Sequence, residues 1–184
     1  MMKSFYDTNE LETLGFNSLG SNVLISKKAS IYGAENISIG NNVRIDDFCI
    51  LSGKIEIGSY IHISAYTGLF AGNVGIIIKD FVTLSSRCAI YAISDDYSGE
   101  YMANPMVPDE YRKVESKKVV FEKYSIVGTG TTILPGSIIG EGTAVGCMSL
   151  VKSVLEPYSI FAGVPCKFIK KRKRDFLKYI NNML

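Results

Sequence analysis

Aliphatic residues recur at every sixth position over most of this 184-residue chain. The first block keeps one unbroken phase at Ile39, Ile45, Leu51, Ile57, Ile63 and Leu69. After a slip of three positions the phase resumes at Ile78, Leu84 and Ile90, and a last block occupies Phe121, Val127, Ile133, Ile139, Val145 and Val151. A period of six fits neither an amphipathic helix nor a single alternating strand, which repeat at about 3.6 and 2 residues. The pattern predicts short strands joined by regular corners, with the aliphatic side chain pointing inward.

Two further positions of the repeat support this interpretation. Glycine often follows the aliphatic residue, as at Gly40, Gly58, Gly128, Gly140 and Gly146. A small or β-branched residue often stands four positions after the aliphatic one, as at Val43, Cys49, Val82, Cys88, Ser125, Thr131, Ser137, Thr143 and Ser149. Each fully buried aliphatic side chain contributes about 1.5–3 kcal/mol. Because no coil can bury its face alone, the coils are stable only as a stack.

This repeat resembles that of the left-handed β-helix acyltransferases over about residues 25 to 170. The resemblance implies an all-β fold, a left-handed parallel β-helix of hexapeptide repeats in the form of a triangular prism. It also implies a homotrimer in which acetyl-CoA lies in the grooves between neighbouring subunits. These last two expectations come from the resemblance and not from the periodicity.

The chain outside the repeat predicts three appendages. Residues 1–24 are expected to form an N-terminal helical cap, in which Asp7 and Glu10 form a capping box and Gly15 ends the helix. The prism is expected over residues 25–166, and an extruded loop over 91–118, where the period is lost. An insertion of this length is usually functional, although an ordered surface loop without a ligand is the alternative. Residues 167–184 are expected to form a C-terminal basic helix.

Composition narrows the possible functions. With 47% hydrophobic and 21% charged residues, the chain is typical of one soluble globular domain. Its net charge is +2, but six positive charges lie within residues 167–174, and the other 14 basic residues face 18 acidic ones. This run could bind nucleic acid, but no aromatic platform or helix-turn-helix pattern accompanies it, so no nucleic-acid partner is expected. There is no apolar run of 18–20 residues and no hydrophobic signal core, so no membrane association and a cytoplasmic location are expected.

The cysteine and histidine content argues against a metal enzyme. The four cysteines lie far apart without a Cys-x-x-Cys pair, and the chain has a single histidine. A zinc carbonic anhydrase, which uses a β-helix of the same kind, needs three histidines in each site. We therefore expect no required metal.

His62 is the single candidate for a conventional imidazole base. It precedes the inward Ile63, so its ring is expected to point outward, where a histidine is often merely solvated. The segments Tyr60 to Ser64 and Leu69 to Val74 resemble sugar-nucleotide N-acetyltransferases of this fold. The resemblance implies that His62 acts as a base or orients the thioester, and that Asn73 lies near the acceptor.

The extruded loop supplies the other acceptor candidates. In galactoside-type O-acetyltransferases a catalytic histidine follows the strand that ends here near Ile93, and that position is occupied by Ser94 or Asp95. Asp95 is a candidate carboxylate base, or a partner for the ammonium group of an amino sugar. Asp96, Tyr97 and Tyr101 would suit a hydroxyl-rich or amino sugar and are candidate substrate-binding residues.

The candidate acetyl-CoA residues lie late in the chain. The segment from Phe161 to Arg172 resembles the closing signature of the family, a Gly-x-Pro turn that leads into a basic segment whose charges could meet the CoA phosphates. The residues expected to hold the cofactor are Gly128, Thr129, Gly146, Cys147, Lys152, Gly163, Pro165 and Lys167.

Together these features predict an acetyl-CoA-dependent acetyltransferase that acts on a sugar. The loop and the N-terminal helix are similar to those of acetyltransferases that modify dTDP-4-amino-4,6-dideoxyglucose, which favours N-acetylation of a nucleotide-linked sugar for O-antigen or other surface polysaccharide. The alternatives are O-acetylation of a sugar hydroxyl, as in galactoside or polysaccharide acetyltransferases, and a β-helix scaffold that only binds partners.

Overall fold

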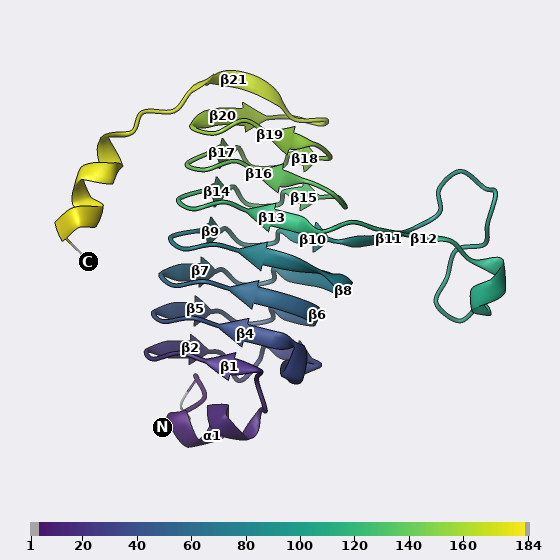
Figure 1. Cartoon of the computed structure of the whole chain (residues 1–184), viewed down its shortest axis with the longest axis horizontal. Helices are drawn as coiled ribbons and strands as arrows, with labels where there is room; N and C mark the ends of the chain where they lie inside the picture. Colours follow the sequence, from purple (N-terminus) through teal and green to yellow (C-terminus); the bar gives the residue numbers. More distant parts are fainter. Residues whose placement is uncertain (1–3, 183–184) are drawn as a thin grey trace.

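The computed structural model describes residues 4–182, which wind into a left-handed parallel β-helix with three flat faces (Figure 1). Face A contains β1 (Ser18–Leu19), β4 (Ile37–Ile39), the ends of β6 (Ile50–Ile57) and β8 (Gly68–Ile78), β13 (Val119–Phe121), β16 (Ile138–Ile139) and β19 (Val154–Leu155). Face B contains β2 (Val23–Ile25), β5 (Val43–Ile45), β7 (Ile61–Ile63), β9 (Thr83–Leu84), β14 (Ile126–Val127), β17 (Ala144–Val145) and β20 (Ser159–Ala162). Face C contains β3 (Ser30–Tyr32), the beginnings of β6 and β8, β10 (Ala89–Tyr91), β15 (Thr132–Ile133) and β18 (Leu150–Val151).

The predicted six-residue phase is confirmed by the strand register. Leu51, Leu69, Ile90, Ile133 and Val151 stand opposite one another on successive strands of face C. All five are fully buried. The slip of three in the sequence falls in β8, which bends around the corner between faces C and A with a shift in register.

The small residues of the repeat fill the inner side of the corners. Ser125, Thr131, Ser137 and Thr143 are buried. The Thr131 hydroxyl donates to the carbonyl oxygen of Gly146 at 3.1 Å, and that of Thr143 donates to Glu156 at 2.6 Å. These hydrogen bonds satisfy polar groups that the turn of the coil buries.

The N-terminal cap is shorter than expected. Helix α1 (Thr8–Thr13) has the predicted capping box, in which the Glu10 amide donates to Asp7 Oδ1 at 3.0 Å and the Asp7 amide donates to Glu10 Oε2 at 2.8 Å. The prism, however, begins at Ser18 in β1 and not at residue 25, because the backbone there already pairs with β4. A 3₁₀ turn, η1 (Ala34–Asn36), precedes β4.

The extruded loop is narrower and more ordered than expected. It leaves the prism after Ala92 and returns at Lys117, whose amide donates to the Ala92 carbonyl oxygen at 2.9 Å. The antiparallel strands β11 (Ile93–Asp95) and β12 (Val114–Ser116) form its stem, and η2 (Asp109–Tyr111) lies near its tip. Figure 1 shows the loop projecting far from the prism.

The prediction of a basic helix over residues 167–184 is wrong for the first part of this segment. Residues Lys167–Lys171 form strand β21, which pairs antiparallel with β20. The last coil leaves backbone groups of β20 unpaired, and a strand satisfies them where a helix would not. A 3₁₀ helix, η3 (Asp175–Asn182), follows and packs Phe176 against Tyr124. Residues 183–184, the end of the expected helix, and 1–3, the start of the expected cap, lie outside the described residues.

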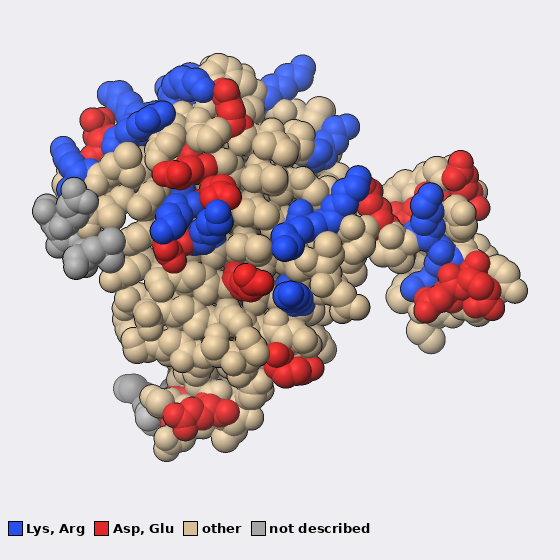
Figure 2. Space-filling view, in the orientation of Figure 1, with Lys and Arg blue, Asp and Glu red and all other residues tan. Residues whose placement is uncertain are grey.

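Charged side chains are unevenly distributed on the visible side of the molecule. Figure 2 shows lysine, arginine, aspartate and glutamate gathered on the upper coils and on the extruded loop, while the lower coils are largely free of charge on this side. The charged groups thus accompany the late coils and the loop, which the sequence assigned to ligands.

Candidate active site

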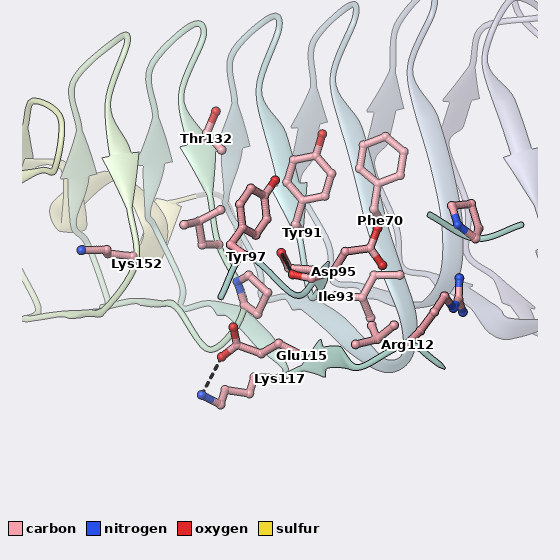
Figure 3. A pocket seen from close by; sticks show the side chains of 15 residues that line it. Phe70, Tyr91, Ile93, Asp95, Tyr97, Arg112, Glu115, Lys117, Thr132 and Lys152 are labelled. Carbon is pink, nitrogen blue, oxygen red and sulfur yellow. Dashed lines mark hydrogen bonds and ion pairs between the residues drawn. The ribbon is translucent and has the colours of Figure 1, made fainter. Parts of the chain in front are cut away.

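A pocket of about 980 Å³ lies where the extruded loop leaves the prism. Face C forms its floor with Phe70, Tyr91 and Thr132, and the loop forms its wall with residues that include Asp95 and Arg112 (Figure 3). Its volume is at the upper end of the range that small-molecule sites occupy. The pocket is large enough for a ligand that combines a sugar with further groups.

The floor of the pocket is an aromatic pair. The rings of Phe70 and Tyr91 stack at a centroid distance of 4.9 Å and an interplanar angle of 13°. They follow the inward residues Leu69 and Ile90 on paired strands, so their side chains point outward at the same level of successive coils. Stacked rings present a flat apolar surface on which a planar or sugar ring can rest.

Three predicted site residues, Asp95, Tyr97 and Lys152, line this pocket. Asp95 ends the first strand of the loop stem, and its Oδ2 accepts a long hydrogen bond of 3.4 Å from the Asn104 amide. Tyr97 is 94% exposed and therefore stands at the mouth. Lys152 follows β18 and enters the pocket from the upper coils.

The other predicted substrate residues, Asp96, Tyr101 and Asn73, do not line the pocket. Asp96 instead organises the loop, because its carboxylate accepts hydrogen bonds from Ser98 and from the Gly99 amide at 3.0 Å. The Ser98 hydroxyl is the main cause that lowers the pKa of Asp96. Tyr101 packs under the Lys113 ammonium, and Asn73 is exposed at the corner beside Gly72.

His62 points outward as predicted, but from another face. It lies on β7 in face B, is 42% exposed, and its Nε2 is 2.8 Å from Asp46 Oδ2. Arg44 Nε also donates to Asp46, at 2.7 Å. Burial alone would raise the pKa of Asp46, but the hydrogen bonds from Arg44 and His62 outweigh it and hold that pKa below its ordinary value. His62 does not line the pocket that contains Asp95, so one chain does not unite the two predicted catalytic residues.

Most predicted cofactor residues follow one edge of the prism, between faces B and C. Gly128 and Thr129 follow β14, Gly146 and Cys147 follow β17, and the turn at Gly163 follows β20. The Gly163 amide donates to the Ser149 hydroxyl at 3.0 Å, which joins this turn to the same edge. Pro165 belongs to the same turn, whereas Lys167 lies in β21 and Lys152 on the pocket side of face C.

Sequence reasoning missed Phe70, Tyr91 and Arg112. The first two had a usable signal, because both are aromatic at the outward position of successive coils. Arg112 had none, since nothing in the loop sequence distinguishes it from its neighbour Lys113.

Within residues 4–182 no three His, Cys, Asp or Glu side chains come close enough together to hold a metal ion. No helix in this same range is long and apolar enough to cross a membrane.

The β-helix of six-residue repeats, with a large pocket beside an extruded loop, fits the hexapeptide-repeat acyltransferases, and the relatives show that the chain belongs to this class. No protein-family model matches it. The dTDP-4-amino-4,6-dideoxy-D-glucose acyltransferase of Escherichia coli is 45% identical over 178 residues, which are 95% of this chain and 92% of the relative. The chain belongs to the family of dTDP-4-amino-4,6-dideoxyglucose N-acyltransferases.

Two further relatives define this neighbourhood. A crystal structure of a variant of AntD, an N-acyltransferase from Bacillus cereus, in complex with dTDP-4-amino-4,6-dideoxyglucose and coenzyme A, superposes with a TM-score of 0.97. It is 52% identical, and the match covers 100% of this chain and 98% of AntD. WbbJ of Escherichia coli K12, named provisionally as a lipopolysaccharide biosynthesis O-acetyl transferase, is 30% identical over 82% of this chain and 76% of its own length.

Proposed function

We propose that this protein transfers the acetyl group of acetyl-CoA to the amine of a nucleotide-linked 4-amino-4,6-dideoxy sugar. The observation that carries the proposal is the pocket in which Asp95 lies among the loop residues above the aromatic floor. The relative from Bacillus cereus, which has coenzyme A and dTDP-4-amino-4,6-dideoxyglucose bound, supports the same substrate class.

In this reaction the amine nitrogen attacks the thioester carbonyl carbon, a C–N bond forms and the C–S bond breaks. The nitrogen loses one proton and the departing thiolate of CoA gains one, so the products are an amide and free CoA. The Asp95 carboxylate can accept hydrogen bonds from the neutral sugar amine, orient it and take the proton that the nitrogen loses on attack, which then passes to the departing thiolate. Positioning of the two reactants contributes as well, because an amine held against a thioester reacts without a bimolecular encounter.

Acetyl-CoA is proposed to lie along the edge between faces B and C. The amides of Gly128 and Gly146 are already committed, since they donate to Val145 and Phe161 at 2.8 Å each. The donors proposed for the pantetheine arm are therefore those of the next residues, Thr129 and Cys147. The two glycines let the coils stack closely there, and Gly163, Pro165, Lys152 and Lys167 would meet the far end of the cofactor.

The active protein is proposed to be a homotrimer with shared sites. His62 on face B and Asp95 beside face C lie on different faces of one prism, and the exposed side chains of Phe48, Tyr66 and Met148 follow the edge between these faces. A neighbouring copy can bring its face B toward this pocket, and His62 would then act as a base or orient the thioester.

Subunit mixing tests the shared site. His62→Ala and Asp95→Ala variants are each expected to be inactive as homotrimers, and trimers assembled from both should regain activity, because some sites receive both native residues. Sedimentation of the wild-type protein gives the oligomeric state. Failure of the mixed trimers to recover would contradict a site that unites these two residues.

The activity itself is tested by release of the CoA thiol. Purified protein with acetyl-CoA is incubated with dTDP-4-amino-4,6-dideoxyglucose, with galactosides and without acceptor. Release with the amino sugar alone is the expected result. Release with hydroxyl acceptors alone would favour O-acetylation, which the similarity to WbbJ makes the second candidate. No acetyl-CoA binding under any condition would leave only a scaffold role.

The proposal extends to the cell. Acetyl-CoA and nucleotide-linked sugars are cytoplasmic metabolites, so we expect a cytoplasmic enzyme. Its product would supply a glycosyltransferase that builds a surface polysaccharide such as O-antigen, which agrees with the role in the name of WbbJ.

A further inference from the structure

The charges in the pocket are separated along its length. Figure 3 shows Lys152 and Arg112 at opposite ends of the pocket, with Asp95 between them. The remaining two charged residues of the lining, Glu115 and Lys117, pair with each other at 2.7 Å and so largely cancel. A ligand in this pocket therefore meets a cation at each end and a carboxylate in the middle.

Neighbouring residues accept hydrogen bonds from only some of the N–H donors of Arg112. Its Nη1 donates to the Asn104 carbonyl oxygen at 3.2 Å and its Nη2 to Asp109 Oδ1 at 2.9 Å. Its Nε is buried and has no hydrogen-bond partner anywhere in residues 4–182. A guanidinium has five N–H donors, so three are left for a ligand.

The existing contacts of Arg112 do not explain its position. The Arg112 side chain is 16% exposed, whereas its ionic partner Asp109 is 93% exposed. An ion pair to so exposed a carboxylate contributes little in water. A buried donor without a partner is rare in proteins and calls for an acceptor that approaches from the pocket. Phosphate oxygens match the planar fork of a guanidinium, which binds them in pairs.

We infer that Arg112 binds the diphosphate of the nucleotide-linked sugar and thereby sets its direction in the pocket. The inference rests on the function proposed above. In a 4-amino sugar nucleotide the amine and the diphosphate stand on opposite sides of the ring, at C4 and C1. With the amine at Asp95, the diphosphate must lie one sugar ring away, toward one of the two cations.

The position of Lys152 decides between the two ends. Lys152 follows β18 at the level of the late coils, to which Gly146 and Cys147 of the edge proposed for acetyl-CoA also belong, so its end of the pocket is assigned to the acyl donor. Phe70 on β8 is separated from β18 by β10 and β15, which is roughly 14 Å at about 4.8 Å per strand. The end near Phe70 and Arg112 is thus left for the nucleotide.

The test compares binding of dTDP and of CoA by isothermal titration calorimetry. Arg112→Gln removes the charge, Arg112→Lys keeps it without the fork, and Lys113→Gln is the matched control, because Lys113 lies next in the chain and outside the pocket lining. We expect Arg112→Gln to weaken dTDP at least tenfold, Arg112→Lys to weaken it less, and Lys113→Gln to change it by less than twofold. The affinity for CoA should change by less than twofold in all three.

Because Arg112 also contacts Asp109, a structural role needs its own control. Asp109→Asn breaks the ion pair and leaves the guanidinium in place. If Asp109→Asn weakens dTDP as much as Arg112→Gln does, Arg112 merely holds the loop and the inference fails. It also fails if Arg112→Gln leaves dTDP binding unchanged, or weakens CoA instead, since the diphosphate at Arg112 would then be that of CoA.

Acetyl transfer by the wild-type protein separates this inference from the proposed function. Transfer to dTDP-4-amino-4,6-dideoxyglucose with a normal KM in Arg112→Gln would overturn the role of Arg112 and leave the function intact. A raised KM for the nucleotide sugar with an unchanged KM for acetyl-CoA is the expected result. A wild-type protein that neither binds dTDP nor uses the amino sugar would overturn both.

Discussion

Gly128 is expected both to let neighbouring coils stack closely and to form part of the edge proposed to bind acetyl-CoA. Replacing it by alanine tests the two roles. A Cβ at Gly128 would lie 2.5 Å from the Cys147 amide nitrogen and 2.8 Å from the Gly146 carbonyl carbon. Both are backbone atoms of the next coil, so the coils themselves must shift. Overpacking of this kind costs typically about 1–3 kcal/mol. At about 2–4 °C per kcal/mol for a chain of this size, the Tm should fall by roughly 2–12 °C.

Gly140→Ala is the matched control. Its Cβ would lie 2.5 Å from the Leu155 carbonyl oxygen, again backbone of the next coil, but on the edge between faces A and B. Thermal unfolding followed by circular dichroism should show a similar loss in both variants. CoA affinity, measured well below both Tm values, should fall in Gly128→Ala alone.

Two results would refute this reasoning. An unchanged Tm in Gly128→Ala would mean that coil stacking does not require glycine there. Equal loss of CoA affinity in both variants would mean that general destabilisation, and not contact along the edge between faces B and C, weakens the cofactor.

Two further predictions concern titratable groups. Burial raises the pKa of the Cys49 thiol to about 11 and also raises that of Cys88, whereas Cys147 is exposed. Iodoacetamide should therefore modify Cys147 first, and acetyl-CoA should slow this modification, both measured by mass spectrometry. Rapid labelling of Cys49 in the folded protein would contradict the prediction. The lowered pKa of Asp46 stabilises the fold fully above the unfolded value of about 3.9, and this contribution is lost as the pH falls through the folded value. The Tm difference between wild type and Asp46→Asn should therefore be largest above about pH 4 and shrink below it, and a difference that grows toward lower pH would show the sign to be wrong.

The periodic part of the fold could be predicted from the sequence because every inward position has the same physical requirement. A buried aliphatic residue must stack on its equivalent in the next coil, as Leu69 does on Leu51 and Ile90. The strand at Lys167–Lys171 could not be predicted, because its sequence is equally compatible with a basic helix. The unpaired backbone of β20 decides the outcome, and that is a property of the assembled coils.

The residues of the candidate site likewise fall into those that the sequence named and those that it did not. The sequence named Asp95, Tyr97 and Lys152, which line the pocket, because they belong to segments with a recognisable family likeness. Arg112 was not named, because its importance lies in a buried Nε without a partner, which no sequence spacing reveals. His62 was found as an outward residue, but the sequence alone could not tell that face B carries it away from the pocket.

The contrast between regular coils and an irregular loop also suggests how one fold can serve different acceptors. The proposed donor edge is built from regular coils, where Gly128 and Gly146 are fixed by stacking against the next coil. The proposed acceptor wall is built from a loop whose stem makes one antiparallel pair and whose tip is exposed, so its side chains are free of the six-residue constraint. Substitutions at Arg112 or Asp95 can therefore change the acceptor while the donor edge stays intact, whereas a change at Gly128 affects the stack and the donor together.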